Sequence, residues 1–312
     1  MSVRIDKILT KEDDRPRISA SSIKDWFSCQ YKWKVKNIDK FKSPANIYLV
    51  TGTMFHWTQE LTDKRGSELP NGKIDDKWFD ALWAMVREEY QNGLRDNYDH
   101  AVVDPLYKEG KETLEPIVKV LFTEGIHLLR EGGPILASEA WAKLDVPHTD
   151  YYLHGYIDRL FTTGFKWDFK TSKAKWGPFK KYGEVQHLIY PAMTLADITY
   201  FTDGNGDIQS APMPKPEIED FKFFVAIKHK RPKFPNTFQT DWVTTVRGIN
   251  ELKRQSTMKM ITSIVREIEM HKEADDWIPN VLTGMCNYCD VRKAGLCPSM
   301  PKFIDGVDNK GE

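Results

Sequence analysis

The chain has 312 residues, of which 40% are hydrophobic and 29% charged, a composition typical of a soluble globular protein with one large domain or two. Basic and acidic residues number 45 each, so no global field attracts nucleic acid and a polyanion would have to meet a local patch. No apolar run reaches the roughly 18 residues of a membrane span. The polar N-terminus predicts no secretory signal, and we expect a cytoplasmic protein without membrane contact.

The N-terminal part of the chain predicts helices. Serines before Ile23 are candidate N-caps of a short amphipathic helix that reaches Trp33, with Cys29 on it or just after it. Further helices are predicted from Thr51, over 75–91 and over 104–130, where apolar residues recur at helical spacing. Their aromatic residues are expected in a core. These segments predict a helical lobe outside the sheet.

From Pro134 onward the apolar residues alternate with period two, which predicts strands over 135–146, 151–161 and 165–171. Gly164 can take a positive φ in the turn between the last two, so they form a β-hairpin. A helix over 182–200, a polar loop over 202–216, a buried strand over 221–228 and a helix over 237–271 follow. This order predicts an α/β fold with the hairpin at the centre of its sheet.

The second arm of the hairpin carries the candidate chemistry. Because strand side chains alternate between faces, Asp168 and Lys170 share one face of the sheet, and Asp158 can approach from the first arm. Taken alone, Asp-x-Lys is most often a surface ion pair. Two carboxylates and a lysine on a rigid sheet are also what a site needs to bind a divalent metal and cleave a phosphodiester.

Four cysteines are present, at 29, 286, 289 and 297, and three of them fall in the last 27 residues. In a reducing cytoplasm this clustering favours metal ligation over disulfides. The two residues between Cys286 and Cys289 let both sulfurs reach one centre, with Cys297 behind them. Either His271 or Cys29 could supply a fourth ligand. By ligand count, zinc and iron–sulfur fit four sulfurs equally well.

Four motifs together resemble a known family. Gly155-x-Ile-Asp158-Arg, Asp168-Phe-Lys170-Thr and Gln186-x-x-x-Tyr190 resemble the RecB branch of the PD-(D/E)XK nuclease superfamily, and Gly52-Thr-x-x-His56 is similar to its histidine motif. The split cysteines resemble the iron–sulfur subgroup of that branch, which includes the AddB nuclease domain and the CRISPR-associated RecB-like exonucleases. The resemblance covers nearly the whole chain.

The resemblance implies a restriction-endonuclease-like core, in which helices flank a central mixed sheet, together with the helical lobe and an iron–sulfur cap. It implies a single RecB-like nuclease domain over 1–312. Within it, 18–132 would be the N-terminal helical part, 133–272 the nuclease core, and 273–312 together with Cys29 the cap.

The resemblance also assigns roles to residues of the site. His56, Asp158 and Asp168 would hold Mg²⁺ or Mn²⁺, and Lys170 would orient or deprotonate the attacking water or neutralise the transition state. Glu139 would add an acid, and Gln186 and Tyr190, one helical turn apart, would hold the substrate phosphate or Lys170. Outside the resemblance, His56 is more simply a packed histidine, Glu139 an exposed strand residue, and Gln186 and Tyr190 an amphipathic pattern. Cys29, Cys286, Cys289 and Cys297 would bind a 4Fe–4S cluster, with zinc as the alternative.

Two basic runs are candidate DNA contacts, although charged runs are usually solvated faces. Both would lie at the mouth of a phosphodiesterase site, where cations grip the backbone and aromatic rings such as Phe179 stack on bases. Their members are Lys173, Lys175, Trp176, Lys180 and Lys181 after the hairpin, and Lys228, Lys230 and Arg231 after the next strand.

The sequence therefore predicts a metal-dependent deoxyribonuclease, an exonuclease acting on DNA ends or single strands in recombination, repair or CRISPR spacer processing, and compatible with a phage gene. Its partners would be DNA and proteins of those pathways, or further copies of itself. One alternative is a non-catalytic iron–sulfur or zinc DNA-binding subunit, and another is an endonuclease on the same fold. No G-x-x-x-x-G-K-[ST] loop is present, which excludes a motor of that type.

Overall fold

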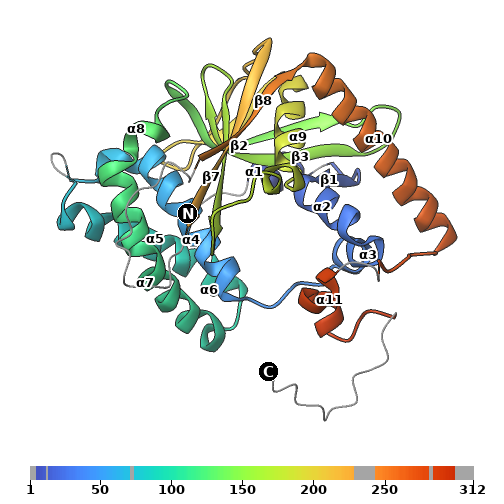
Figure 1. The fold of residues 1–312 in the computed structure, drawn as a ribbon, viewed down its shortest axis with the longest axis horizontal. Helices are drawn as coiled ribbons and strands as arrows, with labels where there is room; N and C mark the ends of the chain where they lie inside the picture. Colours follow the sequence, from blue (N-terminus) through green and yellow to red (C-terminus); the bar gives the residue numbers. More distant parts are fainter. Residues whose placement is uncertain (1–4, 12, 71–73, 228–242, 281–283, 299–312) are drawn as a thin grey trace. The chain divides into compact units, whose positions relative to one another are not determined.

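The computed structural model describes residues 5–11, 13–70, 74–227, 243–280 and 284–298 (Figure 1). Its contacts divide the chain into two compact units. The larger unit comprises Met1–Ala20 and Ala45–Thr262, and the smaller one Ser21–Pro44 and Ser263–Glu312. No helix of the described residues is both long and apolar enough to cross a membrane.

The described helices and strands are as follows. The α-helices are α1 Ile5–Leu9, α2 Ala20–Ser28, α3 Gln30–Asn37, α4 Ile47–Arg65, α5 Asp76–Asn92, α6 Leu94–Asn97, α7 His100–Glu124, α8 Ile126–Leu129, α9 Gln186–Ala192, α10 Glu251–Ala274 and α11 Asp290–Lys293. The strands are β1 Arg17–Ser19, β2 Ile135–Asp145, β3 Tyr152–Phe161, β4 Lys166–Ser172, β5 Ile198–Thr202, β6 Ile208–Pro212, β7 Ile218–Ile227 and β8 Val243–Asn250. Short 3₁₀ helices include η1 Gly66–Glu68, η2 Lys180–Gly183, η3 Met193–Leu195 and η5 Gly284–Tyr288.

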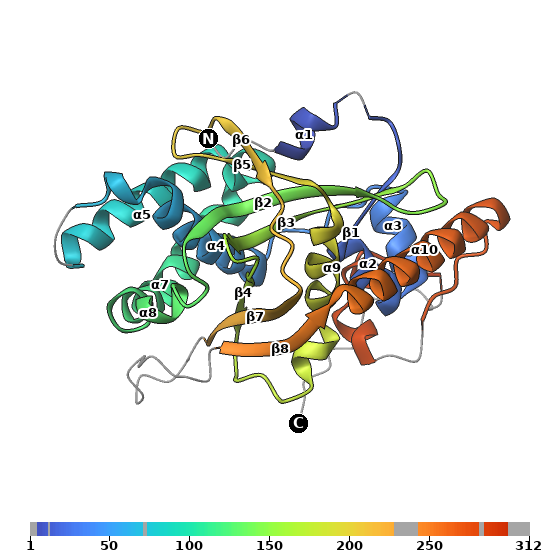
Figure 2. The ribbon, with the colours of Figure 1, turned by 90° about the horizontal axis from the view of Figure 1, so that it is seen from above.

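The strands form one mixed sheet in the order β6-β5-β2-β3-β4-β7-β8, which Figure 2 shows from one edge to the other. Most neighbours are antiparallel, but β4 pairs in parallel with β7, and β1 pairs in parallel with β3. The β3–β4 hairpin occupies the middle of this order. The prediction of an α/β fold with a mixed central sheet flanked by helices is thereby confirmed, and it is consistent with a restriction-endonuclease-like core.

The turn of the central hairpin depends on a glycine. Gly164 has φ +87°, a conformation that side chains with a Cβ adopt at a cost, and its N–H donates to the carbonyl of Phe161. A Cβ at this position would lie 2.5 Å from Cδ of Pro216. Both the backbone and the space around it therefore require glycine here, as the sequence predicted.

Replacing Gly164 with alanine should lower the free energy of unfolding by about 1–3 kcal/mol or more, since the change adds steric overlap to an unfavourable φ. Urea denaturation measures this loss. Gly177→Ala is the matched control, because a Cβ there meets nothing within 4 Å. Equal stability of the two variants would contradict the role assigned to the turn.

The two arms of the hairpin separate soon after the turn. They pair at Leu160 with Lys166 and at Arg159 with Trp167, and no further pairs between them are formed in the described chain. The first half of β3 instead pairs with β1, from Tyr152 to His154. A fork thus opens on one side of β3, between the end of β1 and the departing β4, and Asp158 lies at this fork.

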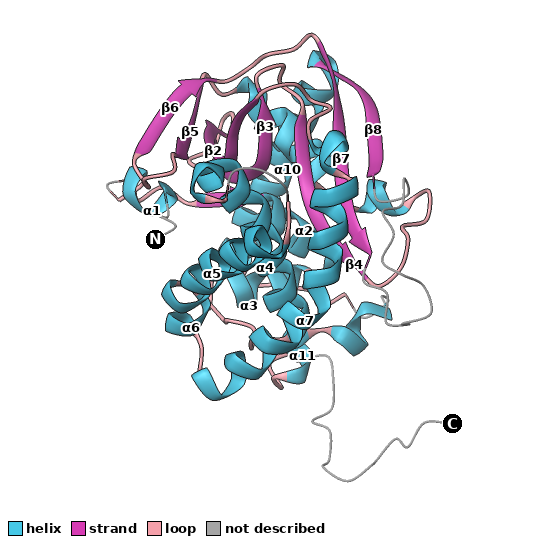
Figure 3. Ribbon diagram, turned by 90° about the vertical axis from the view of Figure 1, so that its left-hand side faces the viewer, coloured by secondary structure: helices cyan, strands magenta, loops and turns pink. Residues whose placement is uncertain are grey.

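The two faces of the sheet carry different helices. Trp167, Phe169 and Phe224 belong to the apolar core that α4, α5 and α7 build on one face, beneath the strands in Figure 3. Phe221 and Phe223 point to the other face, where α9 packs against β4 and β7. The helical lobe therefore covers one face of the sheet instead of standing outside it.

Three predicted elements are wrong. The segment 182–200 is divided into η2, α9, η3 and β5, because Gly183 and Pro191 shorten the helix and Ile198–Thr202 is rich in β-formers. The polar segment after it contains β6, joined to β5 by a turn in which the Asp203 carboxylate accepts the N–H groups of Asn205 and Asp207. The described part of 237–271 begins with strand β8, and α10 starts only at Glu251.

Candidate active site

Asp158 lies where the central hairpin opens. Its Oδ2 accepts the N–H of Phe169 at 2.6 Å, a bond that takes the place of a backbone pair between β3 and β4. The side chain is buried, with 8% of the residue exposed. The strand backbone thus holds this carboxylate in place.

Glu139 lies opposite Asp158 on the neighbouring strand. The partners of Ser138 and Ala140 in β3 are Arg159 and Ile157, so Glu139 stands between them in register. Its φ is +53°, in the left-handed region that costs a non-glycine residue free energy. A strained conformation at this point turns the glutamate toward the fork, and the sequence alone did not predict it.

Helix α4 brings His56 to the two acids. Its Nδ1 lies 3.5 Å from Oδ2 of Asp158 and 3.7 Å from Oε1 of Glu139, while Nε2 lies 2.8 Å from the carbonyl of Phe169. One potential ligand atom from each of His56, Glu139 and Asp158 lies within 4.8 Å of the others. Among the described residues, no other group of three such side chains meets this condition.

Asp168 and Lys170 form an ion pair beside this group. Oδ2 of Asp168 lies 2.5 Å from Nζ of Lys170, and both side chains lie on the same face of β4, as predicted. Asp168 is completely buried, and its Oδ1 has no hydrogen-bond partner among the described residues. A buried carboxylate oxygen without a donor is costly, and a cation at the fork would satisfy it.

Gln186 and Tyr190 belong to α9, which packs against β4 and β7, and the acids of the site act on Tyr190. Gln186 is the first residue of the short helix α9, and Tyr190 lies one helical turn further along it, as predicted. Oε1 of Gln186 is buried and accepts no hydrogen bond from the described residues. Burial and the nearby carboxylates of Asp168, Asp158 and Glu139 raise the pKa of Tyr190 far above its usual value, so its hydroxyl stays protonated.

The charges of the site strongly influence one another. Burial raises the pKa of Asp168 to about 6, with Asp158 adding to the effect and Lys170 opposing it. Burial and Glu139 also raise the pKa of Asp158. Burial lowers the pKa of His56, but Asp158 and Glu139 outweigh it and raise that pKa to about 9. Three acids crowded into a poorly solvated pocket favour a bound positive charge.

A buried ion pair that the sequence analysis did not identify fixes α4 on the sheet. Arg159, which directly follows Asp158, donates from Nε and Nη2 to the two oxygens of Asp63, each at 2.8 Å. Its guanidinium also lies 4.9 Å from the ring centre of Phe169. Asp63 is two helical turns after His56 on α4, a spacing that could have suggested a shared face. This pair sets the position of His56 relative to the strands.

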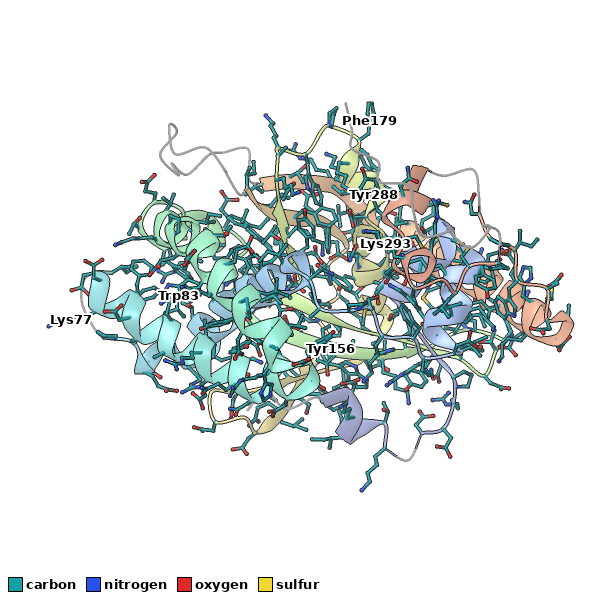
Figure 4. All side chains as sticks on the ribbon, turned by 90° about the horizontal axis from the view of Figure 1, so that it is seen from below. Lys77, Trp83, Tyr156, Phe179, Tyr288 and Lys293 are labelled. Atoms are coloured by element: carbon teal, nitrogen blue, oxygen red, sulfur yellow. The ribbon has the colours of Figure 1, made fainter. Side chains whose placement is uncertain are left out.

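The basic residues after the hairpin have several neighbours. Nζ of Lys173 lies 4.7 Å from the ring centre of Tyr48, and Lys180 pairs with Glu184. The side chain of Trp176 packs against Phe223 in the sheet, and Lys181 donates to the carbonyl of Thr245. Phe179 is 81% exposed and projects from the chain in Figure 4. Lys175 is exposed. Lys228, Lys230 and Arg231 lie outside the described residues.

The four cysteines all belong to the smaller unit. Sγ of Cys29 accepts the N–H of Asn280 at 3.3 Å, and Sγ of Cys286 donates to the carbonyl of the same residue at 3.4 Å. Lys32, whose N–H also reaches Cys29, has its pKa raised by Asp25 and, more weakly, by Cys289, although burial opposes this. Two of the cysteines, Cys29 and Cys286, therefore meet at the backbone of Asn280. The ring nitrogen of His271 instead contacts the Asp276 carboxylate at 2.7 Å.

The chain belongs to the PD-(D/E)XK nuclease superfamily, whose family model matches residues 17–298. A crystal structure from Eubacterium rectale named "Putative exonuclease" is similar with a TM-score of 0.49, at 11% identity over 92% of this chain and 93% of that one. The structure of SSO0001 is similar with a TM-score of 0.37, at 10% identity over 94% and 91%. Similarity at this level does not identify a function. No curated protein matches the chain.

A divalent cation fits the residues of the site. Carboxylates and a histidine are ligands that Mg²⁺ and Mn²⁺ accept, with Mn²⁺ more tolerant of nitrogen. The three ligand atoms of His56, Glu139 and Asp158 are already close, and Asp168 does not belong to this group, although its buried Oδ1 has no hydrogen-bond partner among the described residues. Membership of the nuclease superfamily and a group of ligand atoms that suits a divalent metal are thus in agreement.

Proposed function

We propose that this protein is a metal-dependent DNA exonuclease that hydrolyses phosphodiester bonds at DNA ends or in single strands. The observation that carries the proposal is the convergence of His56, Glu139 and Asp158 on one fork, beside the Asp168–Lys170 pair. Membership of the nuclease superfamily supports the same chemistry and DNA as the substrate class. The proposal of exonuclease action, in contrast to internal cleavage, rests on the resemblance of the sequence motifs to the RecB branch.

The roles that we assign come from the nuclease motifs together with the geometry of the site. His56, Asp158 and Asp168 hold the cation in this proposal, and Glu139 is a further acid. Of these four residues, the ligand atoms of His56, Glu139 and Asp158 lie within 4.8 Å of one another, and Asp168 is not in that group. When bound, the cation polarises the scissile phosphate and lowers the pKa of the attacking water. Burial lowers the pKa of Lys170, but Asp168 and Asp158 outweigh it and raise that pKa, so Lys170 carries a positive charge beside these acids. In the proposal, Lys170 orients or helps to deprotonate the attacking water, or stabilises the charge at phosphorus.

Gln186 and Tyr190 complete the site as neutral hydrogen-bonding groups. The amide of Gln186 and the protonated hydroxyl of Tyr190 can both donate to a phosphate oxygen without adding charge. Lys173, Lys175, Lys180 and Lys181 would hold the DNA backbone next to this site, with Phe179 available for stacking. The cellular setting that we propose is recombination, repair or CRISPR spacer processing.

Replacing Lys170 with methionine should lower DNA hydrolysis in Mn²⁺ by about 10²- to 10³-fold, the usual cost of losing one preorganised charge at a transition state. The parent should lose activity in EDTA and regain it when Mn²⁺ is restored. Lys215→Met, which removes an exposed lysine paired with Asp197, is the control and should leave the rate unchanged.

Two outcomes of this assay favour the alternatives. A folded parent that binds DNA but cleaves none with either metal would indicate a non-catalytic DNA-binding subunit. Cleavage of closed circular DNA would indicate an endonuclease, because a circle offers no end from which an exonuclease can start.

We also propose that Cys29, Cys286, Cys289 and Cys297 bind a 4Fe–4S cluster, as in the iron–sulfur subgroup of the RecB branch. The contacts of Cys29 and Cys286 with the backbone of Asn280 support a shared centre. Zinc fits four sulfurs equally well by ligand count, so the choice of a cluster rests on the resemblance.

Replacing Cys29 with serine should remove the brown colour and most of the iron from protein purified without oxygen. Serine is a good N-cap, so α3 keeps the cap that Cys29 provides by accepting from the N–H of Lys32, and the change tests the ligand and not the helix. Visible absorbance and metal analysis measure the result. Colourless parent protein that contains zinc would overturn the cluster assignment.

A further inference from the structure

A pocket of about 520 Å³ opens directly beside the candidate metal site. His56 and Glu139 line both, so whatever fills the pocket lies next to the phosphate at the fork. Its volume is in the range of about 300–1,000 Å³ that is usual for sites of small organic groups. The proposed function assigns no role to this space.

One wall of the pocket is aromatic and apolar. Helix α4 contributes Tyr48, Leu49 and Trp57, and β3 contributes Tyr156, which Figure 4 labels. Tyr48 is 55% and Leu49 38% exposed, so both side chains are accessible to a ligand in the pocket. Such a wall suits a flat, weakly polar group.

The polar side of the pocket combines an acceptor with a donor. Glu60 and Lys64, both nearly buried, form an ion pair of 2.7 Å, and Lys64 also donates to the hydroxyl of Thr202 at 2.8 Å. Oε2 of Glu60 makes no hydrogen bond with the described residues, so it can accept from a ligand. At the rim, Lys173 lies over Tyr48 and supplies a positive charge.

Gly52 keeps the pocket open. It lies in the middle of α4, where glycine costs the helix roughly 0.5–1 kcal/mol relative to alanine. Its φ is negative, and a Cβ built there meets no atom within 4 Å. Neither backbone strain nor crowding therefore explains why glycine stands at this position. A larger side chain here would enter the free space of the pocket, and glycine leaves that space open.

We propose that this pocket receives the base of the nucleotide next to the scissile phosphate of single-stranded DNA. The aromatic wall stacks on the base, Glu60 and Lys64 face its polar edge, and Lys173 meets the flanking phosphate. A nucleobase is the flat, weakly polar group on a phosphodiester, and the shared residues His56 and Glu139 set its distance from the fork. This inference rests on the proposed nuclease function and names its substrate.

The proposed pocket favours a single strand over a duplex as the substrate. A base in a duplex is paired and stacked, and moving it into a pocket costs a few kcal/mol. A base in a single strand is already unpaired, so most of that cost does not arise. Stacking on protein aromatics is sequence-tolerant because every base has a flat face. Intact duplex DNA should therefore enter only at a frayed end.

Filling the pocket tests the proposal. Gly52→Leu places a side chain in the free space, and Tyr48→Ala removes part of the aromatic wall. Each should weaken binding of a fluorescein-labelled single-stranded oligonucleotide in Ca²⁺ by about 5- to 100-fold, measured by fluorescence anisotropy. Gly66→Leu is the matched control at the end of the same helix, because a Cβ there also meets nothing within 4 Å and Gly66 does not line the pocket.

A base-free probe identifies the group that is bound. An oligonucleotide with one tetrahydrofuran residue in place of a nucleotide, moved along the strand, should lose affinity at one position for the parent. For Gly52→Leu that difference should disappear. Thermal unfolding of each variant checks that the fold is retained, and Gly52→Ala should unfold at the parent temperature or above it.

The outcomes separate this inference from the nuclease function. If the parent hydrolyses DNA in Mn²⁺ but Gly52→Leu and Tyr48→Ala bind the single strand as tightly as Gly66→Leu, the pocket assignment is overturned and the nuclease stands. If the parent hydrolyses neither DNA nor bis(p-nitrophenyl) phosphate but the two variants still lose affinity, the nuclease fails and the base pocket stands. Absence of binding by the parent overturns both.

Discussion

Replacing Asp158 with asparagine is expected to reduce metal-dependent DNA hydrolysis by about 10³-fold or more, the upper range for loss of one charged group aimed at the reaction. Asparagine keeps the shape of the side chain, and its carbonyl oxygen can still accept the N–H of Phe169. What disappears is the negative charge that a cation needs. Rates on a single-stranded oligonucleotide in Mn²⁺, compared with the parent, measure the effect.

The same substitution should not destabilise the metal-free protein. Burial and Glu139 raise the pKa of Asp158 in the folded state, so its ionised form at neutral pH opposes folding, and a neutral side chain removes that cost. The melting temperature in EDTA should equal or exceed that of the parent. Added Mn²⁺ should stabilise the parent, by about 2.7 kcal/mol at 100 times its Kd, and should stabilise the variant much less.

Asp150→Asn is the matched control, since Asp150 is exposed in the loop before the same strand. It should leave both activity and the response to Mn²⁺ unchanged. Loss of activity in Asp158→Asn without loss of the Mn²⁺ stabilisation would show that the cation binds elsewhere. The proposed metal site would then be wrong even if the protein is a nuclease.

Removing Asp63 is expected to cost about 3–5 kcal/mol of unfolding free energy, because it leaves the guanidinium of Arg159 buried without its counter-charge. Only 2% of the Arg159 side chain and 10% of the Asp63 side chain are exposed. The substitution also frees α4 from β3, so His56 loses its fixed position beside Asp158. We therefore expect Asp63→Ala to lose activity along with stability.

Urea denaturation of Asp63→Ala measures the loss, and Glu68→Ala provides the comparison. Glu68 pairs with Arg65 at the end of the same helix but is 49% exposed, so its removal should change the stability far less than removal of Asp63. The double variant Asp63→Leu with Arg159→Met should recover most of the stability, because no buried charge is left unpaired. If all three variants unfold at the same urea concentration, the pair does not hold α4.

Local patterns were sufficient to predict the centre of this fold. The alternation around Asp168 and Lys170, and a glycine able to turn between two apolar arms, predicted the hairpin because strand periodicity and turn chemistry depend only on neighbouring residues. The same holds for α4, α5 and α7, whose apolar faces repeat at helical spacing. The edge strands β6 and β8, and β5 beside β6, were missed, since their residues are equally compatible with loops or helix until a neighbouring strand pairs with them.

The identities of the candidate site residues came from motifs, but their arrangement did not. Nothing in the spacing of His56, Glu139 and Asp158 indicates that a helix and two strands bring them within 4.8 Å of one another. The positive φ of Glu139 and the bond from Phe169 to Asp158 exist only because β3 and β4 separate at this point. The partnership of Asp63 and Arg159, and the open space above Gly52, likewise depend on how α4 lies on the sheet.

The amino-acid sequence by itself determined which chemical groups this protein has and which short elements carry them, because helix, strand and turn preferences are local. It also placed three cysteines close together near one end of the chain. Only the tertiary structure decided that acids from two strands and a histidine from a distant helix share one fork, and that a pocket for a flat group opens beside it. Distances between segments far apart in the chain are set by packing, and packing is a property of all the segments at once.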